Sequence, residues 1–282
     1  MSWEHIEIPN GKTSVFCNAH IKSKNAMNII VTHTPIVTTL EMQQAYEPFE
    51  KYDVNVFAFD FSGTGKSGGN PKNFSRKSVI QDLNTVVTYV ENNYSTNIHL
   101  YGNTGIGGMF AQQYAATNTR IKSFAQFACV HYKDTAGGMG YPYPIVKVMS
   151  AVLGAMPQFR FPLKPPKYKG YRHEEDNAFY ETLTKKHPDI WKANTKVLKA
   201  LMECFVAEDS SAKNSVIVPT LVFKVLHDRY FTPEYFDRYF QTLTCEKRLV
   251  EIKGIHNSYY LDAEEFCRHV YEWFVKHSNL SN

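Results

Sequence analysis

The sequence contains no long hydrophobic run and almost no net charge, and both absences exclude classes of protein. No run of roughly 18 apolar residues occurs, so we expect no segment that spans a membrane. The N-terminal residues lack the basic and apolar regions of a secretory signal peptide. The chain has 31 Lys and Arg against 27 Asp and Glu, and this formal charge of +4 predicts no nucleic-acid partner.

Closely spaced cysteines are also absent, and so is any motif that binds a cofactor. The five cysteines are an odd number and lie far apart, which predicts reduced thiols in a cytoplasmic protein. The acidic stretch HEED (173–176) is interpreted as a solvated charged loop, because nothing in its pattern indicates a metal site. We therefore expect a reaction that needs neither metal nor cofactor.

Short β-rich runs alternate with helical segments along most of the chain. Continuous apolar runs such as NIIVTH (28–33) and VNVFAFDF (54–61) are typical of strands buried on both faces. This alternation predicts an α/β fold in which a mostly parallel central sheet is flanked by helices. The expected strands are 13–21, 28–33, 54–61, 97–102, 122–132, 218–226 and 247–255, and the expected helices are 75–94, 107–117, 232–243 and 262–278.

The alternation stops between residues 133 and 216. This segment is rich in Gly, Pro, Met and aromatic residues, and only part of it has a helical pattern. We interpret residues 1–132 and 217–282 as one core domain, and residues 133–216 as a cap or lid inserted over its pocket. The composition is equally compatible with a mobile lid and with a fixed helical cap.

Five motifs, in order along the chain, resemble those of the α/β-hydrolase fold, which includes esterases and thioesterases. The run NIIVTHTP (28–35) is similar to the strand where the oxyanion hole begins, and FAFDFSGTGKSGG (57–69) resembles the glycine-rich turn after a central strand. The run HLYGNTGIGG (99–108) occupies the place of the nucleophile elbow. The runs VLHDRYFTPE (225–234) and IKGIHNSYYLDAEEF (252–266) resemble the segments that supply the catalytic acid and histidine.

The resemblance implies roles for Asp228 and His256. His256 would be the general base, and Asp228 would orient its ring and stabilise the imidazolium. Each residue follows an expected parallel strand. The carboxyl ends of parallel strands meet at one edge of a sheet, so groups that are remote in sequence can converge there.

The elbow contains no serine, and it can be aligned in two ways. One alignment places Thr104 at the nucleophile position and puts Ile106 where the family has its second glycine. The other places Gly105 there, between Asn103 and Gly107, and leaves the position without a side chain. Threonine can act as a nucleophile beside a base, although its extra methyl group restricts χ1. The sequence leaves both alignments open.

The oxyanion loop also departs from the family pattern. His33 is followed by Thr34 and Pro35, and proline has no backbone N–H to donate to an oxyanion. The Thr34 hydroxyl is a possible substitute donor. We expect the oxyanion hole and the pocket to be lined by His33, Thr34, Pro35, Asn103 and Ile106.

Three functions are compatible with these motifs. The first is a hydrolase or acyl-transfer enzyme that acts on an ester, thioester or related carbonyl compound, with Thr104, Asp228 and His256 as its catalytic residues. The second is a lyase or cyclase without a nucleophile, in which His256 is the general base. The third is a binding protein that has kept the pocket but not the catalysis. The aromatic cap favours a small-molecule ligand with an acyl or aromatic group, and the oligomeric state stays open.

Overall fold

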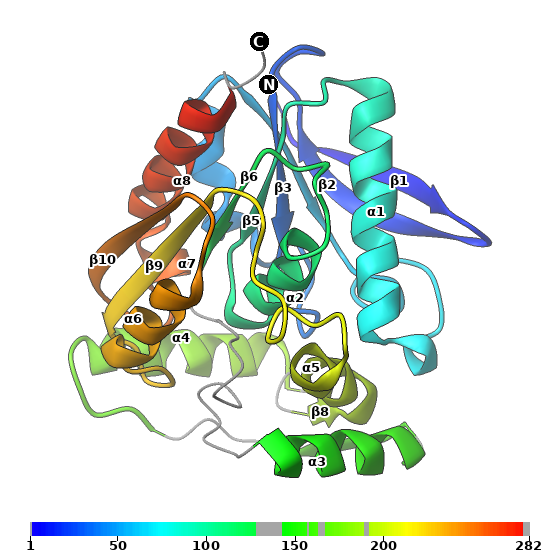
Figure 1. Ribbon diagram of the computed structural model, residues 1–282, viewed down its shortest axis with the longest axis vertical. Helices are drawn as coiled ribbons and strands as arrows, with labels where there is room; N and C mark the ends of the chain where they lie inside the picture. The colour runs from blue at the N-terminus through cyan, green and yellow to red at the C-terminus, as the bar shows by residue number, and fades with distance from the viewer. Residues whose placement is uncertain (1, 128–142, 157, 163–166, 189–191, 279–282) are drawn as a thin grey trace.

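The computed structural model of the protein describes residues 2–127, 143–156, 158–162, 167–188 and 192–278. Its centre is an eight-stranded sheet with helices on both faces, as expected from the sequence (Figure 1). The strand order is β1-β2-β4-β3-β5-β6-β9-β10. The strands are β1 (Glu4–Asn10), β2 (Thr13–His20), β3 (Met27–Thr32), β4 (Val54–Phe59), β5 (Ile98–Gly102), β6 (Ser123–Gln126), β9 (Thr220–His227) and β10 (Lys247–Ile255).

Six of these strands run parallel, and they form the part of the sheet that carries the site. β4, β3, β5, β6, β9 and β10 pair in parallel with one another, whereas β2 pairs antiparallel with both β1 and β4. The sequence analysis missed β1. Its seven residues include four charged or polar side chains and Pro9, and it pairs only with β2 at the edge of the sheet.

The helices cover the sheet in two layers. α1 (Arg76–Asn93), α2 (Gly105–Ala115) and α6 (Pro233–Thr242) contribute buried residues to one core cluster. The short helices η1 (Gln43–Ala45), η2 (Glu47–Lys51) and α7 (Ser258–Leu261) lie over the other face with α8 (Ala263–Ser278). Alternate side chains of the strands point into the two clusters, as Leu100 and Tyr101 of β5 illustrate.

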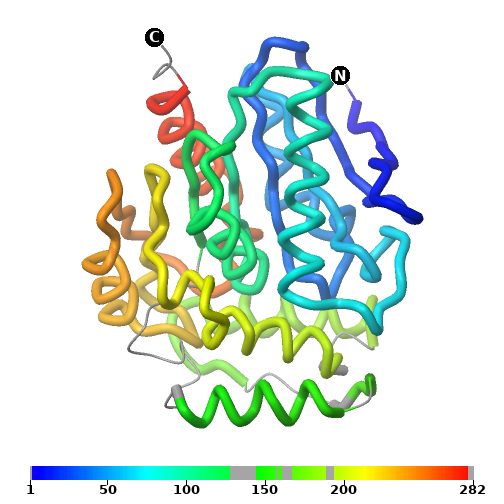
Figure 2. Tube along the Cα trace, turned by 45° about the vertical axis from the view of Figure 1, so that its right-hand side comes forward, coloured from blue at the N-terminus to red at the C-terminus, as the bar shows by residue number. Residues whose placement is uncertain are grey.

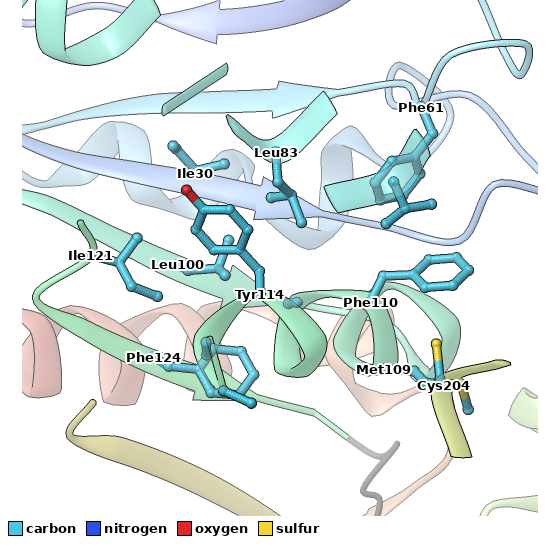
Figure 3. Close-up of a cluster of buried hydrophobic side chains, with 14 of the residues drawn as sticks. Ile30, Phe61, Leu83, Leu100, Met109, Phe110, Tyr114, Ile121, Phe124 and Cys204 are labelled. Carbon is cyan, nitrogen blue, oxygen red and sulfur yellow. The ribbon is translucent and has the colours of Figure 1, made fainter. Parts of the chain in front are cut away.

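Helix α1 illustrates how the local sequence sets an element's bounds. The Ser75 hydroxyl accepts a hydrogen bond from the Ser78 backbone, and the Ser78 hydroxyl accepts one from the Ser75 backbone, which together form a capping box. A buried stripe of valine and leucine then faces the sheet. Figure 3 shows Leu83 of this stripe in the same cluster as Ile30, Leu100 and Tyr114.

The described residues between β6 and β9 form three helices and two short strands. They are α3 (Tyr143–Ala155), β7 (Arg160–Pro162), α4 (His173–Lys186), β8 (Lys192–Asn194) and α5 (Thr195–Val206). These elements gather at one end of the sheet, with α3 outermost (Figures 1 and 2). Residues 128–142, 157, 163–166 and 189–191 lie outside the described residues, and so does the end of the strand expected at 122–132.

This segment packs directly on the core. Cys204 of α5 and Met109 of α2 belong to one buried cluster and lie together in Figure 3. The Gln113 side chain of α2 makes two hydrogen bonds to Ser211, which follows α5. The inserted residues therefore contact the helix that begins at the elbow.

Candidate active site

Asp228 and His256 lie side by side at the carboxyl ends of two paired strands. β9 ends at His227 and β10 ends at Ile255, so each residue is the first after its strand. Because β9 and β10 pair in parallel, the two residues emerge at the same edge of the sheet. His256 Nδ1 lies 2.7 Å from Asp228 Oδ2, and the Asp228 side chain is fully buried.

The second oxygen of Asp228 is held by the backbone. Asp228 Oδ1 accepts hydrogen bonds from the amides of Tyr230 (2.7 Å) and Phe231 (3.0 Å). An ionised carboxylate only accepts hydrogen bonds, so its partner His256 Nδ1 carries the proton. The other ring nitrogen, Nε2, is then an acceptor, and it has no hydrogen bond to any residue that the structure describes.

Aromatic rings surround His256. The ring of Tyr230 meets it edge-on with centroids 4.6 Å apart, and those of Phe127 and Phe231 lie at 6.1 and 6.4 Å. Tyr259 packs on Phe127 at 4.8 Å. The sequence analysis did not assign Phe127, Tyr230 and Phe231 to the site. Their nearness to Asp228 and to the end of β6 was the signal that could have found them.

Thr104 is the last residue before α2, and Gly105 is the first residue of the helix. The Thr104 hydroxyl caps α2 by accepting a hydrogen bond from the Gly107 amide at 3.0 Å. Its backbone is extended, with φ −132° and ψ 166°. Neither Thr104 nor Gly105 has a left-handed φ. Within the described chain, no hydrogen bond joins Thr104 to His256.

Three glycines let α2 approach the sheet. A Cβ at Gly102 would lie 2.5 Å from the Cα of Gly108, and one at Gly108 would lie 2.8 Å from the Phe127 carbonyl oxygen. A Cβ at Gly107 would lie 2.7 Å from the Cα of His33. Ile106 is partly buried and packs against the cluster beneath α2. The close contacts are therefore made by Gly107 and Gly108 instead of position 106.

His33 is held below the oxyanion loop by a buried carboxylate. His33 Nε2 lies 3.1 Å from Asp60 Oδ1, which also accepts a hydrogen bond from the Thr39 amide. Asp60 Oδ2 accepts one from the Lys66 amide at 2.7 Å. Gly65 has φ +51°, and a Cβ there would lie 2.2 Å from Asp60 Oδ2, so the turn requires glycine. The turn at 57–69 thus orients the loop at 33–35.

Polar atoms without partners follow β3 and β5. Thr34 Oγ1 and both side-chain polar atoms of Asn103 are buried, and they form no hydrogen bond within the described part of the chain. Pro35 supplies no N–H. Burial of an unpaired amide or hydroxyl costs free energy unless a ligand satisfies it. These groups can donate to a carbonyl oxygen that binds beside them.

One expectation about the inserted segment is wrong. The stretch 173–176 is the start of helix α4 and not a loop, and Asp176 within it is fully buried. Its carboxylate lies 2.5 Å from Arg229 Nη1 and accepts a hydrogen bond from Asn257 Nδ2 at 2.7 Å. Three acidic residues at the start of a helix are favourable next to its dipole, which the sequence analysis did not use.

Comparison with known proteins identifies the family. The family model described as serine aminopeptidase, S33, matches residues 23–260. The chain belongs to this α/β-hydrolase family. The family is named for a serine, but the elbow of this α/β hydrolase, residues 99–110, contains none. No curated protein sequence matches this α/β hydrolase.

Solved structures share the fold of this α/β hydrolase at low sequence identity. One, DcsB in complex with its substrate analogue, has a TM-score of 0.72 and 17% identity, and the match covers 98% of this chain and 99% of that one. The α/β hydrolase GrgF from Penicillium sp. sh18 has a TM-score of 0.72 and 13% identity, with 99% of each chain covered. A thioesterase domain from the curacin biosynthetic pathway has a TM-score of 0.63 and 14% identity, and the match covers 96% of this chain and 100% of that one.

The described residues provide neither a metal-binding cluster nor a membrane-spanning helix. No group of three or more His, Cys, Asp or Glu side chains is arranged to hold a metal ion in the described ranges. Among the helices that the structure describes, none is long and apolar enough to cross a membrane.

Proposed function

We propose that this α/β hydrolase is an enzyme that transfers or hydrolyses the acyl group of an ester, thioester or related carbonyl compound. The observation that carries the proposal is the pair of Asp228 and His256, whose atoms Oδ2 and Nδ1 are 2.7 Å apart. The pair leaves Nε2 of His256 free to accept a proton within the described chain. Such a base, oriented by a carboxylate, is what acyl transfer needs.

In the proposed reaction His256 Nε2 takes the proton of the attacking hydroxyl, and Asp228 stabilises the resulting imidazolium. The substrate carbonyl oxygen becomes negative as the new bond forms. The Asn103 Nδ2 and Thr34 Oγ1 donors, which are buried and unpaired among the described residues, would stabilise that charge. The rings of Tyr230 and Phe231 beside His256 suit a substrate with an apolar or aromatic group.

Thr104 is the candidate nucleophile. Its oxygen accepts a hydrogen bond from Gly107, and the hydroxyl hydrogen is therefore available to a base. Gly105 is the alternative position and carries no side chain, so in that case the chain has lost its nucleophile. Residues 133–216 act in this proposal as the cap that covers the substrate.

Labelling with an alkyl fluorophosphonate tests the nucleophile, because the attacking oxygen forms a bond to phosphorus as fluoride leaves. We expect the wild-type protein to be labelled at Thr104, and Thr104→Ser to react faster because it lacks the hindering methyl group. Thr104→Val keeps the shape without the hydroxyl and should not react. Peptide mapping by mass spectrometry identifies the labelled residue.

Gly105→Ser is the matched variant for the other alignment. If Gly105→Ser is labelled in a way that depends on His256, and neither wild type nor Thr104→Ser is labelled, the Thr104 mechanism is wrong. His256→Ala in each background separates base-assisted labelling from nonspecific reaction. Labelling that survives His256→Ala would contradict the role of His256 as base.

A reaction without a covalent nucleophile is the second candidate, and the geometry of the elbow favours it. The Thr104 hydroxyl caps α2, its backbone is extended, and it has no hydrogen bond to His256 in the described chain. His256 would then abstract a proton from the substrate directly, as in a lyase or cyclase. In that case turnover survives Thr104→Val and is lost in His256→Ala. A binding protein would show ligand affinity and no turnover.

A further inference from the structure

We infer that Asp176, on the inserted helix α4, is a positioning residue. It fixes the position of the loop that carries Asp228 relative to the loop that carries His256. The inference rests on the proposed role of His256 as base. It goes further, because it assigns part of the catalytic geometry to the inserted segment.

Asp176 contacts the residue that follows each member of the pair. Its Oδ2 lies 2.5 Å from Nη1 of Arg229, which follows Asp228 in the chain. Its Oδ1 accepts a hydrogen bond at 2.7 Å from Nδ2 of Asn257, which follows His256. One carboxylate therefore bridges the loop after β9 and the loop after β10.

The bridge is almost completely shielded from water. The side chain of Arg229 is 3% exposed and that of Asp176 is 0% exposed. The rings of Tyr168, Tyr180 and Tyr230 lie 5.1–5.6 Å from the guanidinium carbon of Arg229. Screening by solvent is weak there, so the ion pair restrains the positions of both partners more strongly than a surface pair does.

Other contacts join the inserted segment to the same two loops. The Tyr168 hydroxyl donates to the His227 carbonyl oxygen at 3.2 Å, directly before Asp228. Arg172, at the start of α4, forms an ion pair with Asp262, which lies beyond the His256 loop. Burial raises the pKa of Asp176, while the charges of Arg229 and His256 act in the opposite direction.

These contacts have a consequence for catalysis. The Asp228–His256 hydrogen bond depends on two loops that β9 and β10 place near each other but do not join. Asp176 joins them. A displacement of about 1 Å at a catalytic group can reduce a rate by about a hundredfold. Loss of the bridge should therefore lower kcat and leave KM nearly unchanged, since the Asp176 side chain is fully buried and acts through the two loops.

The first readout is the downfield NMR signal of the His256 Nδ1 proton, which is bonded to Asp228. It is assigned by its disappearance in His256→Gln. We expect a sharp signal in the wild type and a broadened or missing one in Asn257→Ala, which removes only the bond to the His256 loop and keeps the Asp176–Arg229 ion pair. Asp176→Leu with Arg229→Met removes both charges and also the oxygen that accepts from Asn257, and it should give the same loss.

Glu175→Gln is the matched control, because Glu175 is the neighbouring acid on α4 and pairs with Arg172 at a side-chain exposure of 51%. It should leave the signal and the rate as in wild type. Where turnover is measurable, kcat should fall about tenfold or more in the two bridge variants.

Two outcomes separate this inference from the proposed function. An unchanged signal and unchanged kcat in both folded bridge variants would overturn the positioning role of Asp176. A signal that changes in the bridge variants, combined with turnover that survives His256→Ala, would support the bridge and refute the proposed function. Circular dichroism shows whether each variant is folded before it is compared.

Discussion

At the scale of single residues, three buried or half-buried histidines have different roles because they have different partners. His33 binds Asp60 and lies under the oxyanion loop. His99 lies in the sheet and is hydrogen-bonded to the side chains of Ser123 and Asn97. His256 binds Asp228 and keeps Nε2 free within the described chain. Residue type alone does not distinguish them.

The environment of His99 predicts a loss of stability in acid. Burial lowers the pKa of His99 from its ordinary value of 6.5 to about 3. The unfolded chain therefore binds a proton at this residue below pH 6.5 that the folded chain does not bind, so stability falls as the pH falls. Between pH 6.5 and 5 this residue should reduce the free energy of unfolding by about 2 kcal/mol, measured by urea denaturation.

His99→Gln tests this assignment, because glutamine keeps a hydrogen-bonding side chain that does not titrate. Its free energy of unfolding should decline less between pH 6.5 and 5 than that of the wild type. His173→Gln, at an exposed position, should leave the decline unchanged. An equal decline in His99→Gln and wild type would contradict the assignment.

At the scale of elements, replacing a glycine by alanine should have opposite effects on stability at the contact between α2 and β5 and in helix α3. Where α2 meets β5, Gly102 and Gly108 are so close that an added Cβ at Gly102 would overlap the backbone. In α3, a Cβ at Gly154 would meet only the flexible end of Lys199, at 3.1 Å. The same substitution should therefore destabilise one site and stabilise the other.

We expect Gly102→Ala to lower the free energy of unfolding by about 2 to 3 kcal/mol, because it crowds a packed contact. Gly154→Ala should raise it by about 0.5 to 1 kcal/mol, because alanine favours the helix. Chemical denaturation of both variants beside the wild type measures the two values. A stabilising Gly102→Ala would show that α2 and β5 can separate at little cost.

The elements also differ in how well their sequence predicts them. β10 has the expected bounds of 247–255, and α1 and α8 match to within a residue at each end, because their apolar pattern is long and periodic. β1 was missed, since an edge strand buries little. The start of α4 was mistaken for a loop, since its first residues are acidic and only Asp176 among them is buried.

At the scale of the whole molecule, the inserted segment and the core share one hydrophobic cluster. Val197, Ala200 and Phe205 of α5 are buried with residues of α1 and α2. We therefore expect the two parts to unfold together. Phe205→Ala should lower the free energy of unfolding by about 3 to 5 kcal/mol. Scanning calorimetry should show one transition at a reduced Tm.

Val148→Ala is the control for this prediction. Val148 lies on the outer side of α3 with 64% of its surface exposed, so its loss should change stability by less than about 0.5 kcal/mol. Two separate calorimetric transitions in Phe205→Ala would mean that the inserted segment unfolds independently of the core.

The sequence by itself determined the α/β class, the order of most strands and helices, and the positions of Asp228 and His256 after two strands. These follow from local periodicity and from the edge that parallel strands share. Only the tertiary structure decided that the Thr104 hydroxyl caps α2, that Asn103 and Thr34 are buried without partners among the described residues, and that Asp176 bridges the two loops. Those contacts join residues that are remote in sequence, and no local pattern encodes which of them will meet.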